Sequence, residues 1–118
     1  MKENLLLKYS EQLAIEIENL RQTLNNIKGI SNTIFQIRKS SSSVFANISE
    51  AQYPQSLADM LSKLKIARKE TIETESWLKL LFSSGYITEE SFKQYRNLCG
   101  RIRRILTSSC VTIENKLN

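Results

Sequence analysis

The cationic side chains of this sequence are concentrated in one segment near its C-terminal end. Between Ser91 and Ile113 there are five lysines and arginines and no aspartate or glutamate. Lys and Arg neutralise phosphates, so a clustered basic face is the electrostatic signature of a nucleic-acid-binding surface. A solvated face that keeps the protein soluble is the alternative, because no sequence-reading motif accompanies the charges. The candidate RNA- or DNA-binding residues are Lys93, Arg96, Arg101, Arg103 and Arg104.

Catalytic, metal and cofactor sites lack their usual residues. The chain has no histidine, which removes most catalytic triads, most zinc sites and the Glu-x-x-His pairs of di-iron bundles. It contains neither the P-loop pattern nor G-x-G-x-x-G. Without imidazole partners, Glu70, Glu73 and Glu75 are expected to be structural or solvated. We expect no enzyme, metal or cofactor, and only an acidic pocket with shifted carboxylate pKa values would favour catalysis.

The two cysteines and the single tryptophan are also expected to be structural. Cys99 and Cys110 are eleven residues apart on what we expect to be one helix, hence separated by about 16 Å, too far for a disulfide. We therefore expect reduced thiols that pack in or near the core. A lone Trp77 is typical of a core or interface anchor.

Length and composition favour one all-α domain over residues 1–118. The chain has only three glycines and one proline, whereas many short strands and turns would need more of both. Its formal charge of +5 favours acidic partners without identifying one. No apolar run approaches the roughly 20 residues that span a bilayer, and the start lacks the apolar core of a signal peptide. We expect a cytoplasmic protein that does not bind membranes.

Hydrophobic periodicity predicts four helices near residues 3–28, 31–51, 56–84 and 88–116. Apolar positions advance by alternating steps of four and three, the spacing of one helix face. In the first segment this face consists of Leu6, Ser10, Leu13, Ile17, Leu20, Leu24 and Ile27, all apolar except Ser10. Four helices with short connections pack most simply as an antiparallel up-down-up-down four-helix bundle. The turn residues at the junctions are Gly29, Pro54 and Gly85, and the expected N-caps are Ser31, Ser56 and Thr88.

The serine run from Ser40 to Ser43 has two interpretations. Serine is a weak helix former, and clusters of it often mark a flexible linker. However, apolar positions resume in phase after the run, from Val44 to Ala51, which favours one continuous helix. In the last segment, Phe92, Tyr95, Leu98, Ile102, Ile105, Leu106 and Ile113 fall on one side, and we expect the basic residues on the other.

Two blocks of sequence resemble a known family. The first is residues 37–51, IRKSSSSVFANISEA; the second comprises SLADM at 56–60 and KLKIARKETIETESWL at 63–78, followed by Gly85-Tyr86-Ile87. They are similar to the signature of the four-helix-bundle proteins encoded in bacterial 23S ribosomal RNA intervening sequences. Phe45 and Leu57-Ala58 depart from the family's usual residues.

The resemblance implies a bacterial cytoplasmic protein that assembles as a ring-like homopentamer, in a family whose molecular role is poorly defined. The family is similar in fold to the accessory protein of diversity-generating retroelements, a basic pentamer that engages reverse transcriptase and nucleic acid. A non-catalytic, self-assembling bundle that contacts RNA or DNA is one hypothesis. A protein–protein interaction scaffold without nucleic-acid binding is the other. Apolar residues left outside the helix seams also favour self-assembly: Leu5, Phe35, Phe45 and Phe82.

Four polar residues at positions of the family signature are expected to be architectural. Asn47 and Glu50 are three residues apart, as are Glu70 and Glu73, so each pair can share one helix face. Half-buried polar groups are costly unless they are hydrogen-bonded, so such residues would fix how the second and third helices pair. The alternative is an acidic cluster that touches a ligand in the assembled ring.

Overall fold

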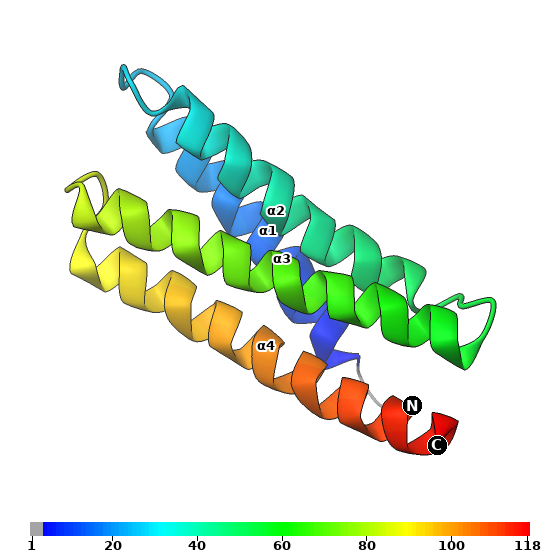
Figure 1. Cartoon of the computed structure of the whole chain (residues 1–118). Coiled ribbons are helices and arrows are strands. Elements are labelled where there is room, and N and C mark those ends of the chain that lie inside the picture. Colours follow the sequence, from blue (N-terminus) through cyan, green and yellow to red (C-terminus); the bar gives the residue numbers. More distant parts are fainter. Residues whose placement is uncertain (1–3) are drawn as a thin grey trace.

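Four α-helices make up the fold in the computed structural model, which describes residues 4–118. Their bounds are α1 Leu5–Thr23, α2 Ser31–Glu50, α3 Leu57–Ser83 and α4 Glu89–Leu117. Successive helices run in opposite directions, and α1 and α3 each contact both α2 and α4 (Figure 1). The predicted antiparallel four-helix bundle is therefore confirmed. None of the helices within residues 4–118 combines the length and apolarity needed to cross a membrane.

The core is one continuous cluster to which every helix contributes its predicted stripe. Its fully buried side chains include Leu13 of α1, Ile37 of α2, Leu78 of α3 and Ile102 of α4. Removing one such side chain from water contributes roughly 1.5–3 kcal/mol. Burial of these stripes, rather than helix propensity alone, holds the bundle together.

The first helix is shorter than the apolar spacing predicts. α1 ends at Thr23 instead of continuing to about residue 28. Leu24 is still buried just beyond the helix, whereas Ile27 is exposed in the turn. Asn25 and Asn26 follow directly, and asparagine competes for backbone hydrogen bonds and favours turns. The apolar spacing therefore overestimated the length of α1, because Leu24 can reach the core from a non-helical turn.

The turn between α1 and α2 confirms one expectation and contradicts another. Gly29 has φ +89°, the left-handed conformation that favours glycine. Ser31, however, does not cap α2. Ile30 occupies the N-cap position, and no side chain makes a capping hydrogen bond there. Burial of Ile30 against the core fixes this helix start instead.

α2 continues through the serine run, as the phase of the apolar positions predicts. Ser40 and Ser41 are buried, and each hydroxyl donates to a backbone carbonyl three residues earlier. These bonds satisfy the hydroxyl groups inside the helix, so the run does not act as a linker. Because serine is small, it also allows a neighbouring helix to approach α2 closely at this level.

The last two helices begin and end where the capping residues predict. The Ser56 hydroxyl accepts from the Asp59 amide at 3.0 Å, and the Thr88 hydroxyl accepts from the Ser91 amide at 3.1 Å. After α3, the Tyr86 amide donates to the Leu81 carbonyl and the Gly85 amide to the Phe82 carbonyl. With Gly85 at φ +84°, these two bonds form a Schellman motif.

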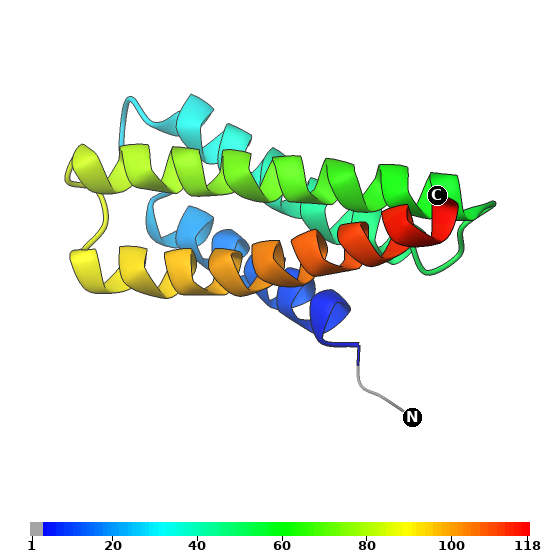
Figure 2. The same ribbon diagram turned by 60° about the horizontal axis from the view of Figure 1, so that its bottom comes forward.

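An apolar groove opens at the end of the bundle where α1 begins. α1 is inclined to α4, so its first turns diverge from the C-terminal half of α4 (Figure 2). The groove has a volume of about 870 Å³ and is lined by α1, α3, α4 and Gln52. Its apolar lining residues are Leu5, Leu6, Leu57, Met60, Leu64, Ile105 and Ile113.

Candidate nucleic-acid interface

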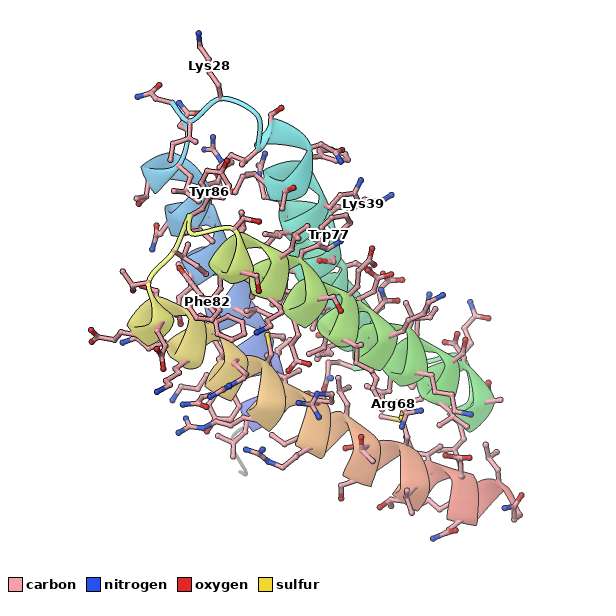
Figure 3. All side chains as sticks on the ribbon, turned by 60° about the vertical axis from the view of Figure 1, so that its left-hand side comes forward. Lys28, Lys39, Arg68, Trp77, Phe82 and Tyr86 are labelled. Atoms are coloured by element: carbon pink, nitrogen blue, oxygen red, sulfur yellow. The ribbon has the colours of Figure 1, made fainter. Side chains whose placement is uncertain are left out.

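Two stacked phenylalanines lie where the end of α3 meets the start of α4. The rings of Phe82 and Phe92 are 4.8 Å apart between centroids and nearly parallel, and Phe82 lies between the two helices (Figure 3). The Lys79 ammonium is 5.3 Å from the Phe82 centroid and 5.6 Å from that of Phe92. The Arg96 guanidinium carbon is 5.6 Å from the Phe92 centroid. Two cations thus rest on one aromatic pair.

Helix geometry explains why these cations stay on the rings. Lys79 precedes Phe82 by three residues on α3, and Arg96 follows Phe92 by four residues on α4. Side chains at these spacings lie side by side on a helix surface. A cation over an aromatic face is attracted by the ring quadrupole without being neutralised. Neither Lys79 nor Arg96 has a carboxylate within ion-pair distance in the part of the chain that the structure describes.

Arg103 lies at the seam between α3 and α4, not on the outer face where the helical projection put it. Its Nη2 atom is 3.1 Å from Oε1 of Glu75, and the two side chains are 41% and 21% exposed. The preceding residue, Ile102, is fully buried, and the Arg103 side chain reaches α3 at Glu75. The buried Nε of Arg103 has no hydrogen-bond partner within residues 4–118.

These side chains line a surface hollow of about 390 Å³, which we call the α3–α4 hollow. Its three cations and one carboxylate leave a formal charge of +2. The lining residues are Ile72, Glu75, Ser76, Leu78, Lys79, Phe92, Arg96 and Arg103. The concave shape and the uncompensated charge together suit an anion.

The other candidate cations lie outside the α3–α4 hollow. Lys93 pairs with Glu89 one turn earlier at 2.9 Å, and this contact lowers the pKa of the Glu89 carboxyl. The Arg101 guanidinium lies 5.9 Å from the ring centroid of Tyr9 on α1. Arg104 is exposed and makes no hydrogen bond, ion pair or ring contact with other described residues. Only Arg96 and Arg103 of the five candidates therefore come together.

Lys79 was not among the candidate residues predicted from the sequence, because the prediction considered only the acid-free segment of α4. Its signal was the pattern Lys79-x-x-Phe82, matched by Phe92-x-x-x-Arg96 across the turn. Both patterns place a cation beside a ring, and the short connection through Gly85 brings the two rings together. Glu75 was expected to be structural or solvated, and in the structure it is the ion-pair partner of Arg103.

The α2–α3 seam contains the other set of predicted polar residues. Within residues 4–118, only Glu50 of this set bridges the two helices through an ion pair. Glu50 of α2 lies 3.1 Å from the Lys63 ammonium of α3. The Asn47 amide instead donates to the Ser43 carbonyl and hydroxyl, within α2. A link that the sequence did not suggest is the fully buried hydrogen bond between the Thr74 and Ser40 hydroxyls, 2.7 Å long.

Glu70 and Glu73 form a half-buried carboxyl pair on α3. Burial raises the pKa of Glu70, and the hydrogen bond and negative charge of Glu73 raise it further, while Lys69 and Lys39 act in the opposite direction. The Trp77 indole donates to Glu73 at 3.4 Å, and Trp77 and Lys39 lie on the α2 side of α3 (Figure 3). The pair is thus connected mainly within α3, and its architectural role stays a prediction.

The cysteines are free and buried. Burial raises the pKa of both thiols, so the nucleophilic thiolate form is disfavoured. Within the described residues, no group of three or more histidine, cysteine, aspartate or glutamate side chains is arranged to hold a metal ion.

Comparisons with known proteins place this architecture in a family. The model of the 23S rRNA-intervening sequence protein family matches residues 2–108. A crystal structure from Bacteroides thetaiotaomicron, described as a protein with unknown function from the S23 ribosomal protein family, has 39% sequence identity and a TM-score of 0.85. That similarity covers 89% of this chain and 97% of the other. No curated protein matches the chain. The chain therefore belongs to the family of 23S rRNA-intervening sequence proteins.

Proposed function

We propose that this protein is a non-catalytic, self-assembling helical bundle that contacts RNA or DNA phosphates through the cationic surface of α3 and α4. The observation that carries the proposal is the α3–α4 hollow, where three cations face a single carboxylate. Arg104 and Lys93 extend the positive surface along α4, which has no acidic residue between Ser91 and Ile113. Such a surface attracts a polyanion at long range and releases counterions on contact.

The way the cations are held supports binding more strongly than their number does. In many basic proteins the cations pair with surface carboxylates, and exposed pairs contribute little. Here Lys79 and Arg96 rest on aromatic rings that orient them without neutralising their charge. Two oriented but unpaired cations can exchange water for phosphate oxygens at a small cost in side-chain entropy.

Binding is tested by titrating labelled RNA and DNA at several salt concentrations. If about four phosphates are contacted, affinity falls on the order of a hundredfold between about 50 and about 200 mM salt. The double variant Arg96→Gln, Arg104→Gln should weaken binding about tenfold or more. Arg103 is left intact because Arg103→Glu would place a second carboxylate against Glu75 and confound binding with folding.

The matched control is the double variant Arg38→Gln, Lys39→Gln, which removes two cations from α2 instead. It should retain most of the affinity, because these residues are remote from the α3–α4 hollow. Binding that ignores both salt and the Arg96 and Arg104 charges would contradict the proposed surface.

Self-assembly is supported by apolar surface that the monomer leaves uncovered. Leu5 and Phe35 are 43% and 56% exposed, and the groove between α1, α3 and α4 adds further apolar surface. Phe82 does not contribute, because its ring packs on Phe92 within the chain. We propose a homo-oligomer, with a pentamer favoured by the family resemblance. Light scattering should give about five times the 13.6 kDa of one chain, and a monomer at micromolar concentration would contradict the proposal.

The second candidate function is a protein–protein interaction scaffold, which the apolar groove favours. With a volume of about 870 Å³, the groove is large enough to receive side chains of a partner protein. Crosslinking in the native host, followed by sequencing of attached nucleic acid and mass spectrometry of attached proteins, distinguishes the two functions. Protein crosslinks without nucleic acid would favour the scaffold.

A further inference from the structure

Three cations and one carboxylate line the α3–α4 hollow, and this imbalance indicates what could fill it. Arg103 places one guanidinium nitrogen against Glu75, but its buried Nε lacks an acceptor within the described residues. A buried donor without a partner is costly and rare in folded proteins. Lys79 and Arg96 border the same hollow with their charges unpaired. The charge of an anion in the hollow would be balanced by all three cations together.

We propose that the α3–α4 hollow binds the terminal phosphate of a nucleic-acid strand. The inference rests on the proposed function and deepens it, because it distinguishes a phosphorylated strand end from the phosphodiester backbone. The rest of the strand then follows α4, where Arg104 is exposed and free of ion pairs among the described residues.

Charge favours a phosphate monoester over a phosphodiester. A monoester carries about −1.5 to −2 charges at neutral pH and three terminal oxygens, whereas each backbone diester carries a single charge. The hollow's formal charge of +2 matches the monoester. Its donors are the Lys79 ammonium and the Arg96 and Arg103 guanidinium groups, and guanidinium is well suited to phosphate oxygens.

The test compares strands of one sequence that carry a 5′-phosphate, a 3′-phosphate or only hydroxyl ends. At fixed salt, a phosphorylated strand should bind about tenfold more tightly, the change that one charge-assisted hydrogen bond contributes. The double variant Lys79→Gln, Arg96→Gln should lose this preference. The double variant Arg38→Gln, Lys39→Gln is the matched control, since it removes two α2 cations outside the hollow and should leave the preference unchanged.

The outcomes separate this inference from the function on which it rests. Equal, salt-sensitive binding of all strands would overturn the terminal-phosphate site and leave the proposed function intact. No binding of any strand would overturn both. A preference that survives in the double variant would overturn the assignment to the α3–α4 hollow. A mononucleotide that binds as tightly as the phosphorylated strand would overturn the assignment to a strand end.

A spectroscopic measurement reports on the hollow directly. The Arg103 Nε–H resonance, assigned by its loss in Arg103→Lys, should shift when the 5′-phosphorylated strand is added, because the phosphate changes the electrostatic environment of the guanidinium group. The hydroxyl-ended strand should leave it unchanged. An unshifted resonance with the phosphorylated strand bound would contradict the proposal.

Discussion

α3 makes two seams of opposite chemistry, one with α2 and one with α4. Toward α2 its polar groups find partners: Thr74 bonds to Ser40, and Lys63 pairs with Glu50. Toward α4, Lys79 and the buried Nε of Arg103 find no acceptor in residues 4–118. A seam whose polar groups are satisfied specifies which helices pair, whereas a seam with surplus donors is suited to an external anion.

The largest expected effect comes from breaking the α2–α3 seam at its buried hydroxyl pair. Thr74→Leu adds volume where Thr74 and Ser40 are fully buried and removes their hydrogen bond. We expect a loss of about 3 kcal/mol in the free energy of unfolding, measured by urea denaturation. Ser62→Leu, on the exposed face of α3, is the control and should change stability by less than about 0.5 kcal/mol. Equal losses of unfolding free energy in the two variants would show that the hydroxyl contact does not determine how α2 and α3 pair.

A smaller loss of stability is expected when the ion pair between Arg103 and Glu75 in the α3–α4 seam is removed. Arg103→Met keeps an apolar stem but leaves Glu75, 21% exposed, without its partner. Removing one member of a buried pair costs several kcal/mol, and the partial exposure of Arg103 reduces this to about 1–2 kcal/mol. Arg104→Met removes a cation without a partner and should be nearly neutral. A stabilised Arg103→Met protein would show that Glu75 is satisfied without Arg103.

The carboxyl pair on α3 gives a pH-dependent effect in the α2–α3 region. The pKa of Glu70 is raised in the folded protein, so folding favours its protonated form. Its contribution to stability is therefore complete below the unfolded pKa of about 4.5 and is lost as pH rises through the folded value. Glu70→Gln should remove this decline, as measured by urea denaturation from pH 4 to 7. If the free energy of unfolding of the unaltered protein and of Glu70→Gln changed with pH in parallel, this would contradict the raised pKa of Glu70.

The smallest effect is expected at the exposed rim of the α2–α3 seam. The Glu50 side chain is 58% exposed in its pair with Lys63, so Glu50→Gln should cost no more than about 0.5 kcal/mol. Glu73→Gln keeps an acceptor for the Trp77 indole and should behave similarly. A large drop in melting temperature or a broken oligomer would support the stronger architectural role predicted from the sequence. Intact assembly with loss of a partner would instead identify a binding site.

The sequence predicted the helices better than it predicted the site, for physical reasons. A stripe such as Leu13, Ile17 and Leu20 has one way to be buried, so periodicity and caps were sufficient for the fold. The predicted end of α1 was wrong because Leu24 reaches the core from a turn. At the site, helical projection put Arg103 on the outer face and could not show that Glu75 lies opposite it on α3. Contacts between helices depend on their relative rotation and register, which a single sequence does not contain.

The most direct test of the central claim is the salt dependence of nucleic-acid binding with and without the ring-bound cations. The slope of the logarithm of the binding constant against the logarithm of salt concentration counts released counterions. If Lys79 and Arg96 contact phosphates, the Lys79→Gln, Arg96→Gln protein should show a slope shallower by about 1.4–1.8 than that of the unaltered protein. Identical slopes for the two proteins would contradict phosphate binding at the α3–α4 hollow.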